Sequence, residues 1–126
     1  MKKYIFKIAT FLYLLLIFYL SSQSTIPGTS IFPHEDKLLH FFAYSILYFL
    51  FLGCFKELDE TTYLKALVLV FLYSISDEMH QHFVVGRDAS IADIIADIIG
   101  AVSMMIIVKK SNGFFKKFVF IKDKTD

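Results

Sequence analysis

Four long runs of apolar residues, separated by short polar stretches, dominate this chain of 126 residues. A helix needs about 20 mostly apolar residues to cross a bilayer, and about 17 can suffice. Because lipid cannot satisfy free backbone N–H and C=O groups, runs of this length are expected to cross as helices. The expected spans are Tyr4 to Leu20, Leu38 to Phe55, Tyr63 to Met79 and Ile91 to Val108. The sequence therefore predicts an all-α fold, an integral membrane bundle of four helices.

The composition agrees with a membrane environment, because 56% of the residues are hydrophobic and only 20% are charged. A soluble domain of this size buries only part of its surface and could not hide so much apolar area. We expect one transmembrane domain over residues 1–110 and a basic, aromatic cytoplasmic tail over 111–126. Such a tail suits a segment that lies on anionic lipid, and a solvated tail fits equally well. Membrane lipids are expected partners, whereas no nucleic acid and no cofactor is expected.

The first span has an alternative interpretation as a cleaved signal peptide. Lys2 and Lys3 precede it, and small polar residues follow it at 21–24. That order of charge, apolar run and small residues is typical of signal peptides. The run is long for one and no Ala-x-Ala follows, so we expect the segment to remain as a span.

Residues between the runs predict where the helices begin. Asp36 is a candidate N-cap for the second helix, and Asp59 or Thr61 for the third. These side chains can accept a hydrogen bond from a free amide of the first turn. The stretch from Ser90 to Asp93 fits a capping box for the fourth helix, with Asp93 as the reciprocal partner.

The basic residues predict an orientation. If the amino terminus is cytoplasmic, the extracytoplasmic side holds only Lys37 and Arg87 of the 13 lysines and arginines, which leaves 11 inside. Lysine and arginine near spanning helices are retained on the cytoplasmic side. We therefore expect a multi-pass plasma-membrane protein with both termini cytoplasmic. Its outer loops would be residues 21–36 and 80–90.

Ionisable residues gather at the helix ends that this orientation places outside. Such residues are costly near a bilayer and are functional candidates by default. Lys37, His40 and Tyr44 share one stripe of the second helix, and Glu78 and Gln81 share a stripe of the third. We expect these side chains to converge. The full set is Lys37, His40, Asp77, Glu78, His80, Gln81, His82, Arg87, Asp88, Asp93 and Asp97.

Two placements in this set oppose the helix dipole. Lys37 is a cation at a helix amino end, while Asp77 and Glu78 are anions near a carboxyl end. The simplest compensation is a direct ion pair of Lys37 with Glu78 or Asp77. Arg87 would then be available to Asp93 or to a phosphate group of a ligand.

The residue types favour acid–base chemistry over a metal site. There is no His-Glu-x-x-His motif and no cysteine pair, and His80 and His82 on a helix point about 200° apart. We therefore predict no standard metal site. Glu78, Asp77 and His40 are candidate catalytic groups, since burial among charges perturbs proton affinity. An ion-pair network that only locks the helices together is the structural alternative.

The pattern of these residues resembles the VanZ-like family over most of the chain, to about Val108. The matching segments are Ser21-Ser22-Gln23, Asp36-Lys37-Leu38-Leu39-His40-Phe41, the run from Ser76 to Arg87, and Asp93 with Gly100. Two positions depart from the family: Val85 stands where a proline is usual, and Asp97 where an asparagine is usual. The second departure leaves any family role at that position open.

The resemblance implies a bacterial cell-envelope membrane protein, in a family named after a protein that gives resistance to the glycopeptide teicoplanin. It also implies that the shared polar residues form the site, whatever its activity. By that reading the catalytic candidates stay Glu78, Asp77 and His40, and the ligand-binding candidates are Lys37, Gln81, Arg87 and Asp93.

Three functions are open at this stage. The first is a binding protein that holds an anionic lipid, a lipid-linked wall precursor or a glycopeptide at the outer leaflet. The second is a membrane-embedded enzyme that acts on a phosphate or ester of such a lipid, with Glu78 as the general base. The third is a proton-coupled carrier with Asp97, Glu78 and His40 as a relay. Four helices without an inverted repeat disfavour the carrier.

Overall fold

The computed structural model describes residues 2–24, 33–111 and 113–119, and all the regular structure in those ranges is helical. The elements are α1 (Lys2–Ser21), α2 (Glu35–Cys54), α3 (Glu60–His82), α4 (Ile91–Lys110) and a short α5 (Phe114–Val119). The predicted all-α bundle of four long helices is confirmed. The predicted tail, residues 111–126, contains α5, while residues 112 and 120–126 lie outside the described ranges.

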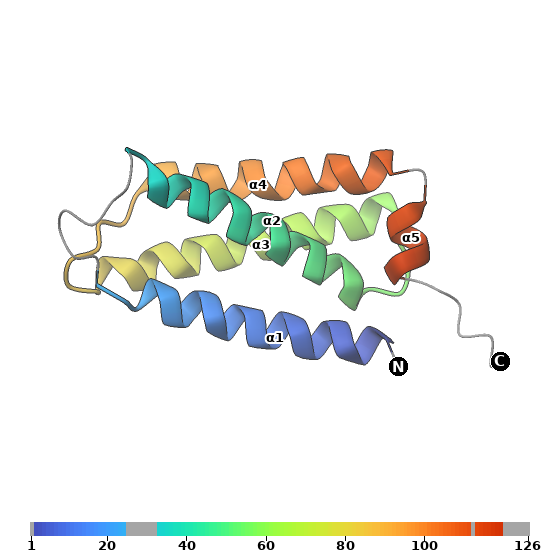
Figure 1. The fold of residues 1–126 in the computed structure, drawn as a ribbon, viewed down its shortest axis with the longest axis horizontal. Helices are drawn as coiled ribbons and strands as arrows, with labels where there is room; N and C mark the ends of the chain where they lie inside the picture. The colour runs from blue at the N-terminus through green and yellow to red at the C-terminus, as the bar shows by residue number, and fades with distance from the viewer. Residues whose placement is uncertain (1, 25–32, 112, 120–126) are drawn as a thin grey trace.

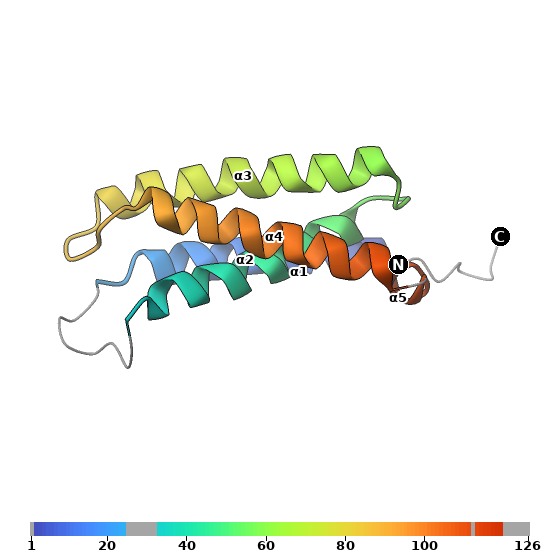
Figure 2. The same ribbon diagram turned by 90° about the horizontal axis from the view of Figure 1, so that it is seen from above.

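The four long helices run side by side along one axis, each reversing the direction of the helix before it (Figure 1). The starts of α1 and α3, the end of α2, and α5 lie at one end of the bundle. The end of α1, the start of α2, the end of α3 and the start of α4 lie at the other, which we call the polar end. Helices α2 and α4 make the most extensive contact, and the view from above shows α3 on one side of α4 (Figure 2).

Three helices are long and apolar enough to cross a membrane: Lys3–Ser21, Glu35–Cys54 and Ile91–Lys110. Helix α3 does not meet the same apolar criterion, although a fourth span was predicted there. With 23 residues it is about 35 Å long at 1.5 Å per residue, and it runs the length of the bundle beside α4 (Figure 2). Its carboxylates Asp77 and Glu78 are buried while Leu64 and Leu72 are exposed. The bundle thus covers these two carboxylates of α3, while several of its large apolar side chains face outward.

The interior of the bundle is built mainly on α2. Tyr44, Leu47, Tyr48 and Leu52 follow one face of that helix and are nearly or completely inaccessible to solvent. Small or β-branched residues of the neighbouring helices pack against this face, including Val70. Large apolar residues elsewhere point outward, most densely on α1. An apolar exterior of this extent is expected of a surface that faces lipid rather than water.

Helices α2 and α4 approach closely at Gly100. A Cβ atom on Gly100 would lie 2.2 Å from the carbonyl oxygen of Phe41. The Ser45 hydroxyl donates a 2.9 Å hydrogen bond to the carbonyl of Gly100 across the same contact. Small residues allow this kind of backbone approach between membrane helices. Gly100 therefore fixes the spacing of the two helices that carry most of the polar end.

The helix starts confirm one predicted cap and correct another. Asp59 is the N-cap of α3, and its side chain accepts a 2.7 Å hydrogen bond from the Thr62 amide. Asp36 does not cap α2, because that helix begins one residue earlier at Glu35 and Asp36 lies in its first turn. The residue before the helix is His34, with a left-handed backbone at φ 65° and no side-chain capping bond.

Candidate functional site

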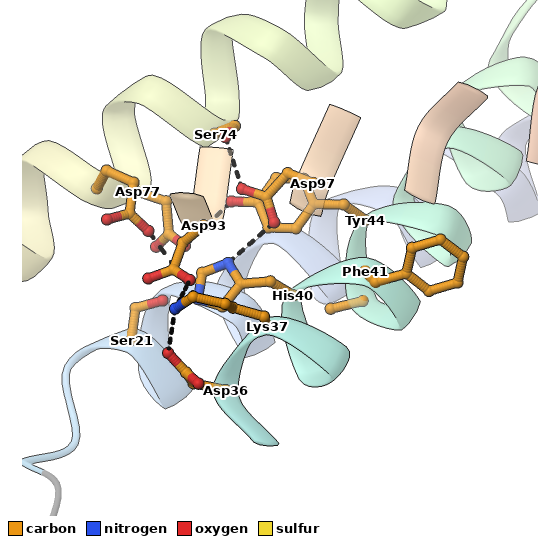
Figure 3. A network of polar contacts seen from close by, with 12 residues as sticks. Ser21, Asp36, Lys37, His40, Phe41, Tyr44, Ser74, Asp77, Asp93 and Asp97 are labelled. Atoms are coloured by element: carbon orange, nitrogen blue, oxygen red, sulfur yellow. Dashed lines mark hydrogen bonds and ion pairs between the residues drawn. The ribbon is translucent and has the colours of Figure 1, made fainter. Parts of the chain in front are cut away.

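Polar side chains from α2, α3 and α4 meet inside the polar end of the bundle (Figure 3). This convergence was expected, because the sequence places these residues at helix ends on the same side of the membrane. Several of them are more than nine-tenths buried, including Asp77, Glu78, Asp93 and Asp97. We call this group the polar cluster. Its members are Asp36, Lys37, His40 and Tyr44 of α2, Ser74, Asp77, Glu78 and Gln81 of α3, and Asp93 and Asp97 of α4.

Asp97 and His40 form the deepest contact of the cluster. The ring Nδ1 of His40 donates to Oδ1 of Asp97 at 2.9 Å, and the Ser74 hydroxyl donates to Oδ2 at 2.6 Å. Asp97 has no solvent-accessible surface, so these two donors replace the water that a buried carboxylate would otherwise need. Sequence analysis placed Asp97 only in the relay of the carrier hypothesis and left its family role open, although its place one turn after Asp93 on the same stripe indicated a member of the cluster.

Lys37 pairs with α4 rather than with α3. Its ammonium group lies 2.9 Å from Asp36 and 3.0 Å from Asp93 (Figure 3). The predicted pair of Lys37 with Glu78 or Asp77 is therefore wrong. The physical reason is the packing of the helices. Helix α2 packs most extensively on α4, so the Lys37 side chain contacts the first turn of α4.

Glu78, and not Asp93 as predicted, accepts the hydrogen bond from the backbone amide of the N-cap residue Ser90. The Ser90 hydroxyl accepts from the Ala92 amide at 3.1 Å, as an N-cap should. The Ser90 amide, however, donates to Oε2 of Glu78 at 2.8 Å. In a capping box that amide would donate to the side chain of the third helical residue, which is Asp93. Here the Asp93 carboxylate forms an ion pair with Lys37 instead. The predicted reciprocal cap is wrong, and a carboxylate of α3 takes its place.

Asp77 is held by one oxygen. The Tyr44 hydroxyl donates to its Oδ2 at 3.0 Å, and the Gln81 amide donates to the same atom at 3.3 Å. Gln81 also donates to the Ser21 hydroxyl at 3.2 Å, which connects the cluster to the end of α1. Gln81 was predicted to contact a ligand, but its side chain is buried, with 2% exposed. In this arrangement its amide connects α3 to α1 through Ser21.

Two carboxylate oxygens in the cluster remain without partners among the described residues. They are Oδ1 of Asp77 and Oε1 of Glu78, both buried. Oε1 of Glu78 lies 3.9 Å from Nε2 of His40. One ligand atom from each of these three residues lies within 4.8 Å of the others. The prediction of no standard metal site considered ligand spacing along single helices, whereas these three residues come from two helices, α2 and α3.

The charges of the cluster do not balance. Its carboxylates are Asp36, Asp77, Glu78, Asp93 and Asp97, and its one lysine is Lys37. With every carboxylate ionised and His40 neutral, five negative charges and one positive charge leave four negative charges; Asp36 is exposed, and the other four carboxylates are buried. Uncompensated charge inside a bundle is strongly unfavourable. The cluster is therefore suited to a cation or to protons, and not to a second anion at its centre.

The remaining predicted candidates lie outside the cluster. Within the described ranges no ion pair joins Arg87 to Asp93 or Glu78, and the buried Nε of Arg87 has no hydrogen-bond partner. His80 contacts the Ser22 hydroxyl at 2.9 Å, and its ring stacks on α1. His82 is exposed. Of the sequence candidates, the structure thus brings together Lys37, His40, Asp77, Glu78, Gln81 and Asp93, and leaves Arg87 in the loop before α4.

Fold and cluster together define a small polytopic membrane protein whose polar residues converge at one end of a helical bundle. The chain belongs to the VanZ/LLP1 family, because the family model of that description matches residues 2–116. The match covers all four long helices and the whole polar cluster, and it confirms the resemblance seen in the sequence. Searches of curated proteins and of solved structures found no match to this chain.

Proposed function

We propose that the chain is a multi-pass protein of the bacterial plasma membrane, with both termini in the cytoplasm and the polar cluster at the extracytoplasmic end. The distribution of basic residues along the sequence supports this orientation, since the predicted topology puts 11 of the 13 on the cytoplasmic side and only Lys37 and Arg87 on the outer side. Membership of the VanZ/LLP1 family supports an envelope role.

The function that we propose is binding of a phosphate-bearing envelope lipid or lipid-linked wall precursor, with reduced susceptibility to glycopeptides such as teicoplanin as its consequence. The observation that carries it is the state of Arg87, whose buried Nε has no partner among the described residues. A guanidinium group with free donors is suited to a phosphate, which it can grip through two parallel hydrogen bonds. The other cation, Lys37, already pairs with two carboxylates. Arg87 therefore becomes the anion contact, and Lys37, Gln81 and Asp93 become positioning residues.

Lipid binding by the purified chain tests this proposal. The probe is a polyprenyl phosphate, titrated against the protein in detergent, with Arg87→Gln and Arg87→Lys as variants. Loss of charge-assisted hydrogen bonds is worth about 1.5–3 kcal/mol, so Arg87→Gln should weaken binding about 10–100-fold. Arg87→Lys should recover only part of the lost affinity, because a lysine ammonium group lacks the planar pair of N–H donors of a guanidinium.

Lys65 offers the matched control, because it is an exposed cation near the opposite end of α3. Lys65→Gln should bind polyprenyl phosphate like the unaltered chain. Equal binding by Arg87→Gln would remove the anion contact from the proposal. Teicoplanin susceptibility of cells that produce each variant gives the second readout, and it should follow the binding.

A membrane-embedded enzyme is the second candidate, favoured by the unpartnered Glu78 oxygen beside His40. A carboxylate with a free lone pair could act as general base on a lipid phosphate or ester. Glu78→Gln is a sharp test, because the amide oxygen can still accept from Ser90 while the base is lost. If a modified lipid in cell extracts disappears with Glu78→Gln and persists with Glu60→Gln, the chain is an enzyme. If the glycopeptide phenotype survives Glu78→Gln, the binding function is sufficient.

A further inference from the structure

We propose that His40, Asp77 and Glu78 bind one divalent transition-metal ion at the polar end of the bundle. This inference goes beyond the proposed lipid binding and does not depend on it. Its basis is the convergence of three ligand atoms from two helices, all within 4.8 Å of one another.

The spacing of these atoms is close to that of a metal site. Bonds from nitrogen and oxygen ligands to zinc are about 2.0–2.2 Å long, so two ligands of one ion lie about 3–4.4 Å apart. Nε2 of His40 and Oε1 of Glu78 are 3.9 Å apart, within that range. Asp77 precedes Glu78 on the same helix, and its ligand atom lies within 4.8 Å of the other two, close to the upper end of that range.

His40 is prepared as a ligand by its second nitrogen. Nδ1 faces a carboxylate oxygen of Asp97 at 2.9 Å, and a carboxylate only accepts, so Nδ1 carries the hydrogen. In the neutral ring Nε2 then has the free lone pair, and it faces Glu78. Ser74 holds the other oxygen of Asp97 at 2.6 Å. Metal-binding histidines are usually fixed in this way by a carboxylate behind the ring.

Each of the two carboxylates in this set has one buried oxygen without a hydrogen-bond partner in the described part of the chain. Oδ1 of Asp77 and Oε1 of Glu78 have no partner among the described residues, and both side chains belong to residues that are only 5% exposed. A cation at their centre would satisfy both oxygens and the His40 nitrogen together. It would also reduce the net negative charge of the polar cluster from four to two.

The ligand types select the ion. One imidazole nitrogen with two carboxylate oxygens suits Zn²⁺ or Mn²⁺, whereas Mg²⁺ and Ca²⁺ prefer oxygen ligands alone. Three protein ligands leave at least one position for water or for an oxygen of a bound molecule. A metal here would therefore present a positive centre at the end of the bundle where Arg87 lies.

Metal binding by the full chain in detergent tests the site. The protein is purified without a histidine tag, stripped with chelator, and titrated with Zn²⁺ alone and then Mn²⁺, with bound metal measured by elemental analysis. We expect one equivalent of Zn²⁺ per chain, with no competition from excess Mg²⁺. Glu78→Gln and His40→Asn should abolish this equivalent. Asp97→Asn should weaken it about 10–100-fold, because the histidine loses its orienting carboxylate.

His82 supplies the matched control, since it is an exposed histidine near the same end of α3, and His82→Asn should keep full binding. Helix content and elution volume of each variant check folding, and Glu78→Gln keeps an acceptor for the Ser90 amide if His40→Asn fails to fold. No Zn²⁺ on the unaltered chain, or Zn²⁺ retained by Glu78→Gln, would overturn the site. Arg87→Gln should bind Zn²⁺ normally, which separates this test from that of lipid binding.

Discussion

Replacing Gly100 by alanine should force α2 and α4 apart and disrupt the polar cluster. The new Cβ would lie 2.2 Å from the Phe41 carbonyl oxygen and 3.0 Å from the Ser45 hydroxyl. Ordinary contact begins at 3.4 Å, so relief requires about 1.2 Å of movement (3.4 − 2.2). Because the Phe41 oxygen belongs to the backbone, no change of side-chain rotamer can provide that movement.

The energies and distances can be worked through. Overpacking a tight interface costs about 1–3 kcal/mol, while alanine in a helix is favoured over glycine by about 0.8–1.0 kcal/mol. We expect a net loss of up to about 2 kcal/mol. If α4 retreats as a rigid body by about 1.2 Å away from α2, the 2.9 Å contact of His40 with Asp97 lengthens to about 4.1 Å (2.9 + 1.2). That distance is no longer a hydrogen bond.

Thermal unfolding in detergent, followed by helix content, measures the first effect, and Zn²⁺ uptake measures the second. Gly53→Ala is the control, because its Cβ would meet the ring of Phe6, a side chain that can move, near the opposite end of the bundle. It should lose less stability and leave the cluster intact. A Gly100→Ala chain that unfolds at a higher temperature than the unaltered chain would refute the close approach of α2 and α4.

Three further predictions concern single contacts. Tyr44→Phe removes a buried donor to the Asp77 carboxylate and should lower the free energy of unfolding by about 1.5–3 kcal/mol in a denaturation series. Lys109→Gln breaks an exposed ion pair with α3 and should change it by less than about 1 kcal/mol. The Thr62 amide lowers the pKa of Asp59, so the stability that this cap adds is present above the ordinary aspartate pKa and is lost as pH falls through the lowered value. Asp59→Ala should therefore reduce the acid sensitivity of the thermal midpoint.

The number and length of the helices could be predicted because one physical condition controls both. A bilayer admits only helices of a certain length, and the apolar runs report that length directly. The polar cluster was also predictable in outline, since Lys37 and Asp93 each lie in the first turn of a helix, α2 and α4, that begins at the same end of the bundle. The third helix was expected to end at Met79 and instead continues to His82. Its polar last turn finds partners in the bundle, and apolarity alone could not reveal them.

The pairings within the cluster could not be predicted, because depth along a helix says nothing about which neighbour it faces. Lys37 meets Asp93 because α2 lies against α4, and that adjacency depends on the close approach at Gly100. The role of Glu78 is equally non-local, since it completes the first turn of a different helix. Spacing rules for caps and for metal ligands apply within one helix. They could not predict contacts between two helices, such as that of Glu78 with Ser90.

The shortage of apolar residues in α3 has a consequence for how the chain is assembled. A segment with this few apolar residues is unfavourable in lipid by itself, and its buried carboxylates gain partners from α2 and from the start of α4, in addition to Gln81 of α3. Glu78 accepts a hydrogen bond from the Ser90 amide at the start of α4, so the end of α3 and the start of α4 stabilise each other. The two helices are expected to enter the membrane as one hairpin during biogenesis, and a chain truncated before α4 should leave its third segment outside the lipid.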